Sequence, residues 1–218
     1  NTPFQNNYHS PHIFRMKAES VIIKISFNDN MFGYGESAPR PYVTGETLES
    51  VATLMRDHFS SLLLGEEIES VRDIELILGL LEDTCRERNI SSYLSALGAV
   101  DLALFDGLSR GLRIPLSGLL NPIVRENITY TLPIPLFPVD TIREFSGYLA
   151  GAAFSSVKVL MEESITKNVE RLEIIRSIFG ADMEIGIEAN GRWTYEKAID
   201  NLTELRKFDI SVVEQPVH

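Results

Sequence analysis

The chain has 218 residues, 44% of them hydrophobic, so it can bury a substantial core as one large or two smaller domains. Its 31 acidic and 20 basic residues give a formal net charge of −11, which disfavours nucleic acids and anionic membranes as partners because both require a basic surface. Cys85 is the single cysteine, and no apolar run approaches the roughly 20 residues that span a bilayer, so we expect a soluble, cytoplasmic protein.

The N-terminal segment predicts a loop followed by a β-hairpin. Residues 1–17 are polar and irregular, with two prolines, and we expect them to form a loop of the kind that often carries specificity. Residues 19–27 and 31–36 alternate in the manner of strands, and the Asn-Asp-Asn sequence at 28–30 is a turn signal between them. A further loop, rich in proline and glycine, covers residues 37–45.

Three helical patterns follow this loop, at residues 47–64, 68–84 and 91–108. The third is rich in alanine and glycine, which allow close packing against whatever covers it. Residues 1–110 are therefore predicted to form an α+β domain that combines a two-stranded sheet with a helical bundle.

The second half of the chain predicts strands that alternate with helices. A connector with two prolines covers residues 111–126, and the region 127–218 begins with a β-rich run and a helix. Two amphipathic helices separate the last three strands, and Thr194 is the expected N-cap of the second helix. Strands separated in this way pair in parallel, because a parallel pair cannot be closed by a hairpin. The four expected strands cover residues 127–136, 155–161, 183–190 and 210–216.

A polar group stands at or near the end of each of the last three strands. These groups are Lys158, Glu188 and Glu214. In parallel α/β folds, groups that take part in chemistry collect at the carboxyl ends of the strands. We therefore expect one amine and two carboxylates on neighbouring strands, with Glu188 and Glu214 at the edge of the sheet where chemistry is done.

Four groups of residues, in order along the chain, resemble the enolase superfamily. The similarity runs over nearly the whole chain and is greatest to the mandelate racemase and muconate lactonizing enzyme type, in the subgroup of muconate cycloisomerases and dipeptide epimerases. Each motif alone is weak, but four in the right order form a strong pattern. The matching residues are 33–40 with 44–47, 99–106, 188–191 with Trp193, and 214–216.

This resemblance implies an α+β capping domain over an α/β barrel of the (β/α)₈ TIM type, of which only about the first half is present. It also implies Mg²⁺ held by carboxylates at successive strand ends, and abstraction of a proton α to a carboxylate with stabilisation of the resulting enediolate. Such reactions include cycloisomerisation, epimerisation or racemisation, and dehydration of a small-molecule carboxylate. Relatives of this type commonly form homo-oligomers.

The same resemblance implies a role for each residue that matches the barrel motifs. Glu188 stands where the first metal ligand is expected, and Glu214 where the second is. Lys158 resembles the second lysine of a Lys-x-Lys pair that supplies the acid or base on the second barrel strand. Asn190, two residues after Glu188 on the same face of an extended strand, would support the metal ligands or the substrate.

In the capping domain, the loops at residues 1–17 and 37–45 match the two segments that close over substrate in this family. Loops of this kind often carry specificity. Arg40, Tyr42 and His12 are then candidates for contacts with a carboxylate or with the distal end of the substrate.

The chain departs from the family pattern at two positions of the barrel. The first metal ligand is normally aspartate, and Glu188 is one methylene longer, whereas Mg²⁺ demands near-octahedral geometry. Ser156 replaces one lysine of the pair if Lys158 is the second. In the alternative alignment Lys158 is the first lysine, and Leu160 takes the place of the second. The choice decides whether an acid or base survives on this strand.

The family's third metal ligand and second catalytic lysine lie on later barrel strands, beyond residue 218. A half barrel would expose the edge of a parallel sheet whose faces and edges are normally covered. We therefore expect either a fragment or a chain that pairs with a partner. Two functions remain open: a Mg²⁺-dependent enzyme that acts on a carboxylate, and a divergent or truncated non-catalytic relative that serves as a binding or assembly protein.

Overall fold

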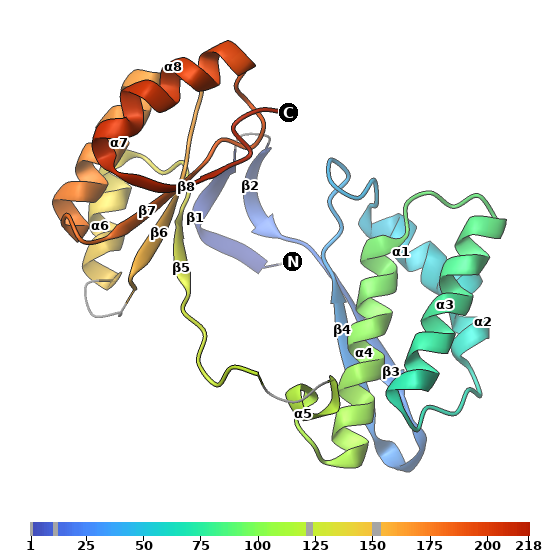
Figure 1. The fold of residues 1–218 in the computed structure, drawn as a ribbon. Helices are drawn as coiled ribbons and strands as arrows, with labels where there is room; N and C mark the ends of the chain where they lie inside the picture. Colours follow the sequence, from blue (N-terminus) through green and yellow to red (C-terminus); the bar gives the residue numbers. More distant parts are fainter. Residues whose placement is uncertain (1, 11–12, 121–123, 150–153) are drawn as a thin grey trace. The chain divides into compact units, whose positions relative to one another are not determined.

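The structure of the chain, a computed structural model, describes residues 2–10, 13–120, 124–149 and 154–218. It divides into two compact units (Figure 1). The first unit contains Lys17–Glu126, and the second contains Asn127–His218 together with Phe4–Met16. Within the described residues, no helix has the length and apolar composition needed to cross a bilayer.

The N-terminal segment forms strands rather than a loop. Strand β1 covers Thr2–Ser10 and strand β2 covers Ile13–Ala18, and the two pair in a two-stranded sheet. The expectation of a loop at residues 1–17 is therefore wrong for the described part of this segment. Proline is tolerated near the start of a strand, which is where Pro3 stands in β1. His12, a candidate for substrate contact, lies outside the described residues.

The first unit is an antiparallel two-stranded sheet packed on helices, which confirms the expected α+β architecture. A 3-10 turn at Asn28–Asn30 joins the two strands, where the turn signal lies. A π-helical turn at Met55–Phe59 divides the first expected helix in two. The elements are β3 Val21–Ser26, β4 Phe32–Ser37, α1 Leu48–Leu54, α2 Ser60–Leu63, α3 Val71–Glu87, α4 Leu94–Leu112 and α5 Leu116–Leu120.

Two helices of this unit begin at side chains that accept hydrogen bonds from the first turn. Before α1, Thr47 Oγ1 accepts from the backbone N–H of Ser50 (3.0 Å), and Ser50 Oγ accepts from the backbone N–H of Thr47 (2.8 Å). Ser70 and Asp73 form the same reciprocal arrangement before α3. Each arrangement pairs N–H groups that a helix otherwise leaves free, so these helix starts are specified locally by the sequence.

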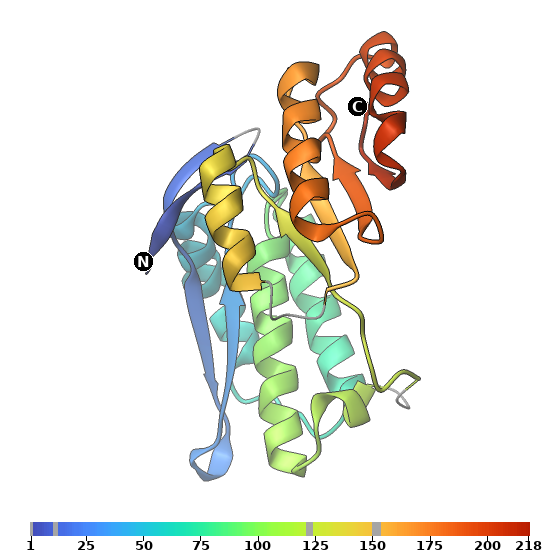
Figure 2. The same cartoon turned by 90° about the vertical axis from the view of Figure 1, so that its left-hand side faces the viewer.

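Helix α4 lies against strand β4 with backbone close to backbone (Figures 1 and 2). A Cβ atom at Gly35 would lie 1.8 Å from the carbonyl oxygen of Ala99, and one at Gly33 would lie 1.9 Å from that of Ala103. Glycine on the strand is therefore required for this approach. The close packing expected from the small residues of this helix is confirmed.

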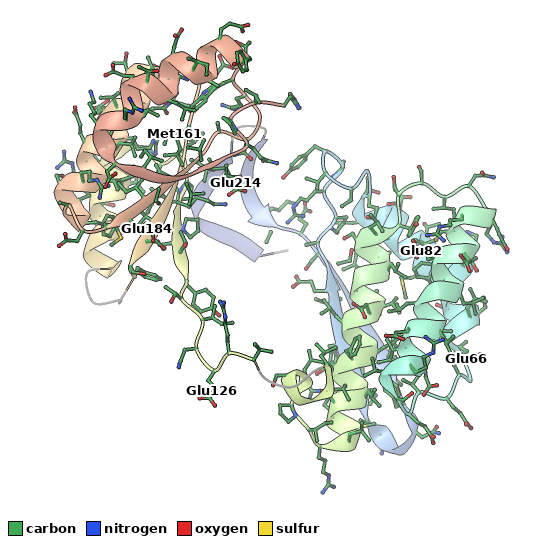
Figure 3. All side chains as sticks on the ribbon, in the orientation of Figure 1. Glu66, Glu82, Glu126, Met161, Glu184 and Glu214 are labelled. Atoms are coloured by element: carbon green, nitrogen blue, oxygen red, sulfur yellow. The ribbon has the colours of Figure 1, made fainter. Side chains whose placement is uncertain are left out.

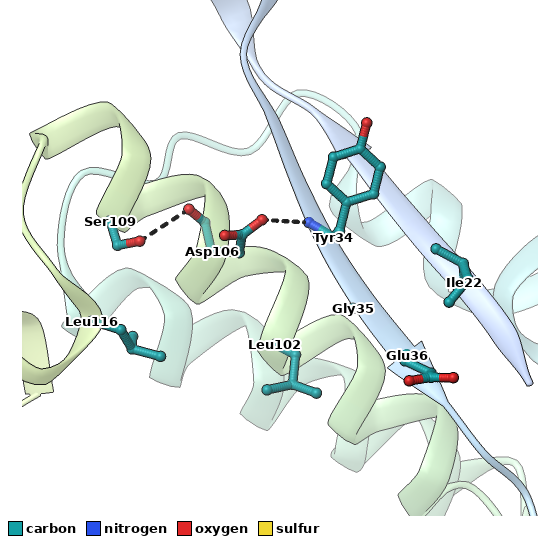
Figure 4. A pocket seen from close by; sticks show the side chains of 8 residues that line it. All are labelled: Ile22, Tyr34, Gly35, Glu36, Leu102, Asp106, Ser109 and Leu116. Carbon is teal, nitrogen blue, oxygen red and sulfur yellow. Dashed lines mark hydrogen bonds between the residues drawn. The ribbon is translucent and has the colours of Figure 1, made fainter.

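A side chain of α4 also protects the outer edge of β4 (Figure 4). Asp106 Oδ2 accepts a hydrogen bond from the backbone N–H of Tyr34 (2.9 Å), and its Oδ1 accepts from Arg110 Nε (2.8 Å). Ile22 and Leu102 line a shallow hollow beside this contact. An edge strand whose N–H group already has a partner is less available for pairing with another chain.

The second unit contains a parallel sheet of four strands in the order β5–β6–β7–β8, with α6, α7 and α8 packed on one face (Figure 1). These are the four parallel strands that the sequence predicts, and β8 is an edge of the described sheet. Thr194 Oγ1 accepts from the N–H of Lys197 (3.3 Å), so it caps α8 as expected. The elements are β5 Thr131–Ile134, α6 Val139–Leu149, β6 Ser156–Leu160, α7 Ile165–Phe179, β7 Glu184–Glu188, α8 Tyr195–Leu205 and β8 Ile210–Glu214.

The two faces of this sheet differ in polarity. Val157 and Val159 of β6, and Ile185 and Ile187 of β7, are at most 1% exposed and pack under the helices. Met161, labelled in Figure 3, continues this buried face beyond β6. The alternate residues of the same strands point to the opposite face, where polar side chains gather.

Candidate active site

Three strands bring Lys158, Glu188 and Glu214 to the polar face of the sheet. Glu188 ends β7 and Glu214 ends β8, and the two are direct partners in the parallel register. Lys158 is the register partner of Gly186, two residues before Glu188, so its side chain leaves the same face of the sheet. Figure 3 shows Glu214 at the end of its strand. The structure thus brings together the three groups that the strand-end argument selects.

Lys158 bridges the two carboxylates. Its Nζ atom lies 2.8 Å from Glu188 Oε2 and 3.0 Å from Glu214 Oε2. The side chains of Lys158, Glu188 and Glu214 are 33%, 14% and 44% exposed, respectively. Solvent therefore reaches the cluster mainly at Glu214, whereas Glu188 is largely enclosed.

The two carboxylates raise the pKa of Lys158. The hydrogen bond to Glu188 is the largest cause, desolvation of the ammonium group acts in the opposite direction, and the hydrogen bond to Glu214 adds to the rise. This arrangement holds the lysine as an ammonium ion. A lysine acts as a base only after it loses that proton, so proton abstraction by Lys158 requires a change in the charges around it.

The loops that follow β7 and β8 are hydrogen-bonded to each other. The N–H of Ala189 donates to the carbonyl oxygen of Glu214 (3.1 Å), and the N–H of Gly191 donates to that of Gln215 (2.8 Å). Trp193 forms a further parallel bridge to the segment after β8. Backbone pairing therefore continues past both carboxylates, which fixes the strand ends that carry them.

Asn190 lies in the turn directly after β7. It is half-buried, and its φ of 53° is a left-handed conformation that asparagine adopts more readily than most residues. The premise of an extended strand from Glu188 through Asn190 is therefore wrong, because β7 ends at Glu188. A role of Asn190 toward metal or substrate stays a prediction.

A buried asparagine, which the sequence argument missed, fixes the turn after β6. Asn168 is fully buried; its Oδ1 accepts from the N–H of Glu162 (2.9 Å), and its Nδ2 donates to the carbonyl oxygen of Glu162 (2.9 Å). Trp193 Nε1 donates to the same carbonyl oxygen (3.2 Å). These bonds hold the turn that follows the strand carrying Lys158. The signal for Asn168 is its place four residues before Leu172, on the face of an amphipathic helix that carries the apolar residues.

A second buried polar group anchors the proline-rich loop of the first unit. Glu46 is 1% exposed, and its carboxylate accepts hydrogen bonds from the backbone N–H groups of Ser95 (2.7 Å) and Ala96 (3.0 Å) at the start of α4. A carboxylate at a helix N-terminus is favoured by charge as well as by hydrogen bonding. The sequence places Glu46 in a motif but does not reveal this partner.

Arg40 and Tyr42 belong to the first unit, whereas Lys158 and both carboxylates belong to the second. Arg40 donates through Nη1 to the carbonyl oxygens of Pro39 (2.8 Å) and Glu19 (3.4 Å), so its guanidinium helps to fix its own loop. Tyr42 is exposed. Contacts of Arg40 and Tyr42 with a substrate stay predictions.

Both positions proposed for the missing lysine lie on the same strand face as Lys158. Ser156 Oγ is hydrogen-bonded to Thr131 Oγ1 (2.7 Å), and Leu160 is 7% exposed beside Glu188 in the register. Either alignment of the Lys-x-Lys pair therefore leaves Lys158 as the lysine of this strand. It is also the side chain that contacts both carboxylates.

The donor atoms of the cluster suit a hard divalent cation. Glu188 and Glu214 offer carboxylate oxygens from adjacent positions, and Mg²⁺ prefers oxygen ligands, usually with several waters. Across the part of the chain that the structure describes, no three His, Cys, Asp or Glu side chains are grouped so that they could hold a metal ion. The two carboxylates thus fit the cation in their chemistry and would provide part of a coordination shell.

Both halves of the chain match known protein families. Residues 2–121 match the family described as mandelate racemase / muconate lactonizing enzyme, N-terminal domain, and residues 140–218 match enolase C-terminal domain-like. The chain is 28% identical to an L-Ala-D/L-Glu epimerase of Bacillus subtilis, over 92% of this chain and 53% of the epimerase. It is 26% identical to an N-succinyl-L-Arg/Lys racemase of Bacillus cereus, over 91% of this chain and 52% of the racemase.

The fold is also that of solved structures. A dipeptide epimerase from Enterococcus faecalis, crystallised with Mg and the dipeptide L-Leu-L-Tyr, matches with a TM-score of 0.85 at 23% identity. The match covers 100% of this chain and 58% of that one. The chain spans about half the length of the curated relatives it matches.

Proposed function

The chain belongs to the mandelate racemase and muconate lactonizing enzyme family of the enolase superfamily, and on this premise we propose that it contributes to a Mg²⁺-dependent enzyme that removes a proton α to a carboxylate. The two named relatives are an epimerase and a racemase, enzymes that invert configuration at one carbon. The observation that carries the proposal is the lateral pairing of Glu188 with Glu214, with Lys158 in contact with both.

In this proposal Glu188 and Glu214 hold the metal ion, and Lys158 moves the proton. Mg²⁺ bound there would supply positive charge next to a substrate carboxylate, which favours loss of the neighbouring proton. The two ligands stand on a backbone whose pairing continues past them, so their positions are set before substrate arrives. Lys158, on β6, reaches both carboxylates. It can accept a proton once it has lost its own, which requires a weaker attraction between the ammonium group and the carboxylates.

We propose a dipeptide or an N-acylated amino acid as the substrate class, and epimerisation or racemisation as the reaction. The names of the relatives support this class, since one acts on L-Ala-D/L-Glu and the other on N-succinyl-L-Arg/Lys. Arg40, Tyr42 and His12 are the proposed contacts to a carboxylate or to the distal end of such a substrate.

Two departures support a second candidate, a non-catalytic relative that serves as a binding or assembly protein. Glu188 stands where the family has aspartate, and the Lys-x-Lys pair is incomplete. Under the first alignment the missing lysine is Ser156, whose hydroxyl is engaged by Thr131 at 2.7 Å. A chain of this kind would keep the strand-end carboxylates without proton transfer.

Calorimetric titration of the whole chain with Mg²⁺ tests the metal site. We expect Glu188→Gln and Glu214→Gln to weaken binding by about tenfold or more, because each removes a charged oxygen ligand. Glu184→Gln is the matched control, since Glu184 is an exposed carboxylate at the opposite end of β7. Binding that is equal in wild type and Glu214→Gln would place the metal elsewhere and overturn the proposal.

Proton exchange separates the two candidates. Wild type is incubated in D₂O with Mg²⁺ and L-Ala-L-Glu or an N-succinyl amino acid, and loss of the α-proton signal is followed by NMR. Metal-dependent exchange supports the enzyme. Metal binding without exchange on either substrate class supports the binding protein.

A further inference from the structure

Lys158 supplies a positive charge to two carboxylates at once. Its Nζ atom is within hydrogen-bonding distance of one oxygen of each, 2.8 Å from Glu188 and 3.0 Å from Glu214. Glu188 and Glu214 are lateral partners on strands that lie about 4.8 Å apart, where like charges repel each other. A cation bonded to both therefore stabilises the pair in its present position.

This bridge differs from an ordinary surface ion pair. It joins three strands, since Lys158 extends from β6 to carboxylates on β7 and β8, and Glu188 is 14% exposed. Lys207 and Glu204, by comparison, are three residues apart and about half exposed. Water and salt screen the Lys158 bridge less than they screen such an exposed pair.

We propose that Lys158 is an internal counter-cation, which a divalent metal must displace from Glu188 and Glu214 in order to bind. The inference rests on the metal site proposed above and adds a coupling to it. The ammonium group occupies Oε2 of both carboxylates that would hold the metal, so the two cations compete for the same pair of side chains. Metal binding then releases the lysine from both hydrogen bonds.

The coupling acts in both directions, because linked equilibria are reciprocal. If metal binding weakens the hold of the carboxylates on Lys158, the lysine must weaken metal binding by the same factor. Removal of the lysine charge should therefore strengthen metal binding, whereas a residue that merely completed the site would weaken it when removed.

Calorimetric titration of the whole chain with Mn²⁺ tests this expectation in wild type and Lys158→Met. Methionine has a side chain of similar length without the charge. We expect the variant to bind Mn²⁺ about tenfold more tightly, because the two ion contacts no longer compete with the metal. Lys207→Met is the control, since it removes the same charge from the exposed pair before β8, and we expect it to leave the affinity unchanged.

The outcomes distinguish this inference from the metal site itself. If wild type binds Mn²⁺ and Lys158→Met binds no more tightly, or if Lys207→Met has an equal effect, the counter-cation role is overturned while the metal site stands. If neither wild type nor Lys158→Met binds, both fall.

A second measurement uses wild type and so does not depend on the folding of Lys158→Met. Lysines are labelled biosynthetically with ¹³C at Cε, which leaves the ammonium group unmodified, and the Lys158 signal is assigned by its absence from Lys158→Arg. We expect this signal to shift on addition of Mg²⁺ at the concentration that saturates the calorimetric binding. A Lys158 signal that Mg²⁺ leaves in place, while the metal binds, would overturn the inference.

Discussion

Replacement of Gly35 by alanine should destabilise the first unit strongly. An ideal Cβ atom at this position lies 1.8 Å from the carbonyl oxygen of Ala99 and 2.9 Å from the backbone nitrogen of Ala103. Ordinary van der Waals contact begins at 3.4 Å, so the closest approach is too short by about 1.6 Å. Both neighbouring atoms belong to the backbone of α4, which cannot yield unless the helix moves.

Relief of this clash requires β4 and α4 to separate along their contact. Overpacking of a core costs about 1–3 kcal/mol when side chains can adjust. Here the backbone has to adjust, so we expect a loss of about 3 kcal/mol or more in the free energy of unfolding. Gly98 provides the matched control on the same helix, because nothing lies within 4 Å of its ideal Cβ position. Alanine there should stabilise by about 0.5–1 kcal/mol, since glycine is a poor helix former.

The chain carries a separate reporter in each unit. Cys85, the single cysteine, is buried in the core of the first unit, and Trp193, the single tryptophan, is buried in that of the second. Thiol labelling of Cys85 during urea unfolding therefore follows the first unit. We expect Gly35→Ala to lower the urea concentration at which half of Cys85 is labelled. Gly98→Ala should leave this concentration unchanged or raise it. A Gly35→Ala variant within about 0.5 kcal/mol of wild type would refute the reasoning.

Three further predictions concern the other polar groups of the fold. Asn168→Ala should cost about 2 kcal/mol, because it leaves the partly buried backbone N–H and carbonyl of Glu162 with fewer partners. Unfolding followed by Trp193 fluorescence measures this loss, and unchanged stability would contradict the prediction. Glu46→Gln should cost about 1–2 kcal/mol, because the amide nitrogen cannot accept a hydrogen bond from the backbone N–H groups at the start of α4. An unchanged urea midpoint in the Cys85 labelling experiment would count against this prediction. The hydrogen bond from Ser70 is the main cause that holds the pKa of Asp73 below its ordinary value of 3.8. Stability from Asp73 is therefore present above that value and lost as the pH falls through the lowered pKa, and Ser70→Ala should raise the pKa in an NMR titration; an unmoved pKa would disprove the assignment.

Local signals in the sequence were sufficient for most of the architecture. The Asn-Asp-Asn turn signal locates the hairpin that contains β3 and β4, and Thr194 marks the start of α8, because each depends on residues close by in the chain. The alternation of strands and helices after residue 127 predicts a parallel sheet for a topological reason. The N-terminal strands were missed because prolines and asparagines dominated the interpretation of residues 1–17, whereas strand pairing is set by backbone hydrogen bonds.

The candidate site could be predicted in composition but not in geometry. Lys158, Glu188 and Glu214 follow from the rule that strand ends collect functional groups. Their register does not follow, because a shift of one residue moves a side chain to the other face of a sheet. Asn168 and Glu46 were missed for a related reason: tertiary structure alone makes these polar side chains buried and supplies their partners.

The backbone pairing that continues beyond β7 and β8 has a consequence for how such a site can diverge. Ala189 and Gly191 anchor the turn after Glu188 to the segment after Glu214, so the backbone frame depends little on which side chains stand at those two positions. A longer or shorter carboxylate then changes reach by a methylene while the frame stays in place. If Glu188 holds a metal ion as proposed, glutamate in place of aspartate at position 188 is an exchange of ligand length on an inherited scaffold. Positions 188 and 214 are accordingly where we would look for altered metal preference among descendants of the same fold, and where new ligands could be engineered with the least disturbance of folding.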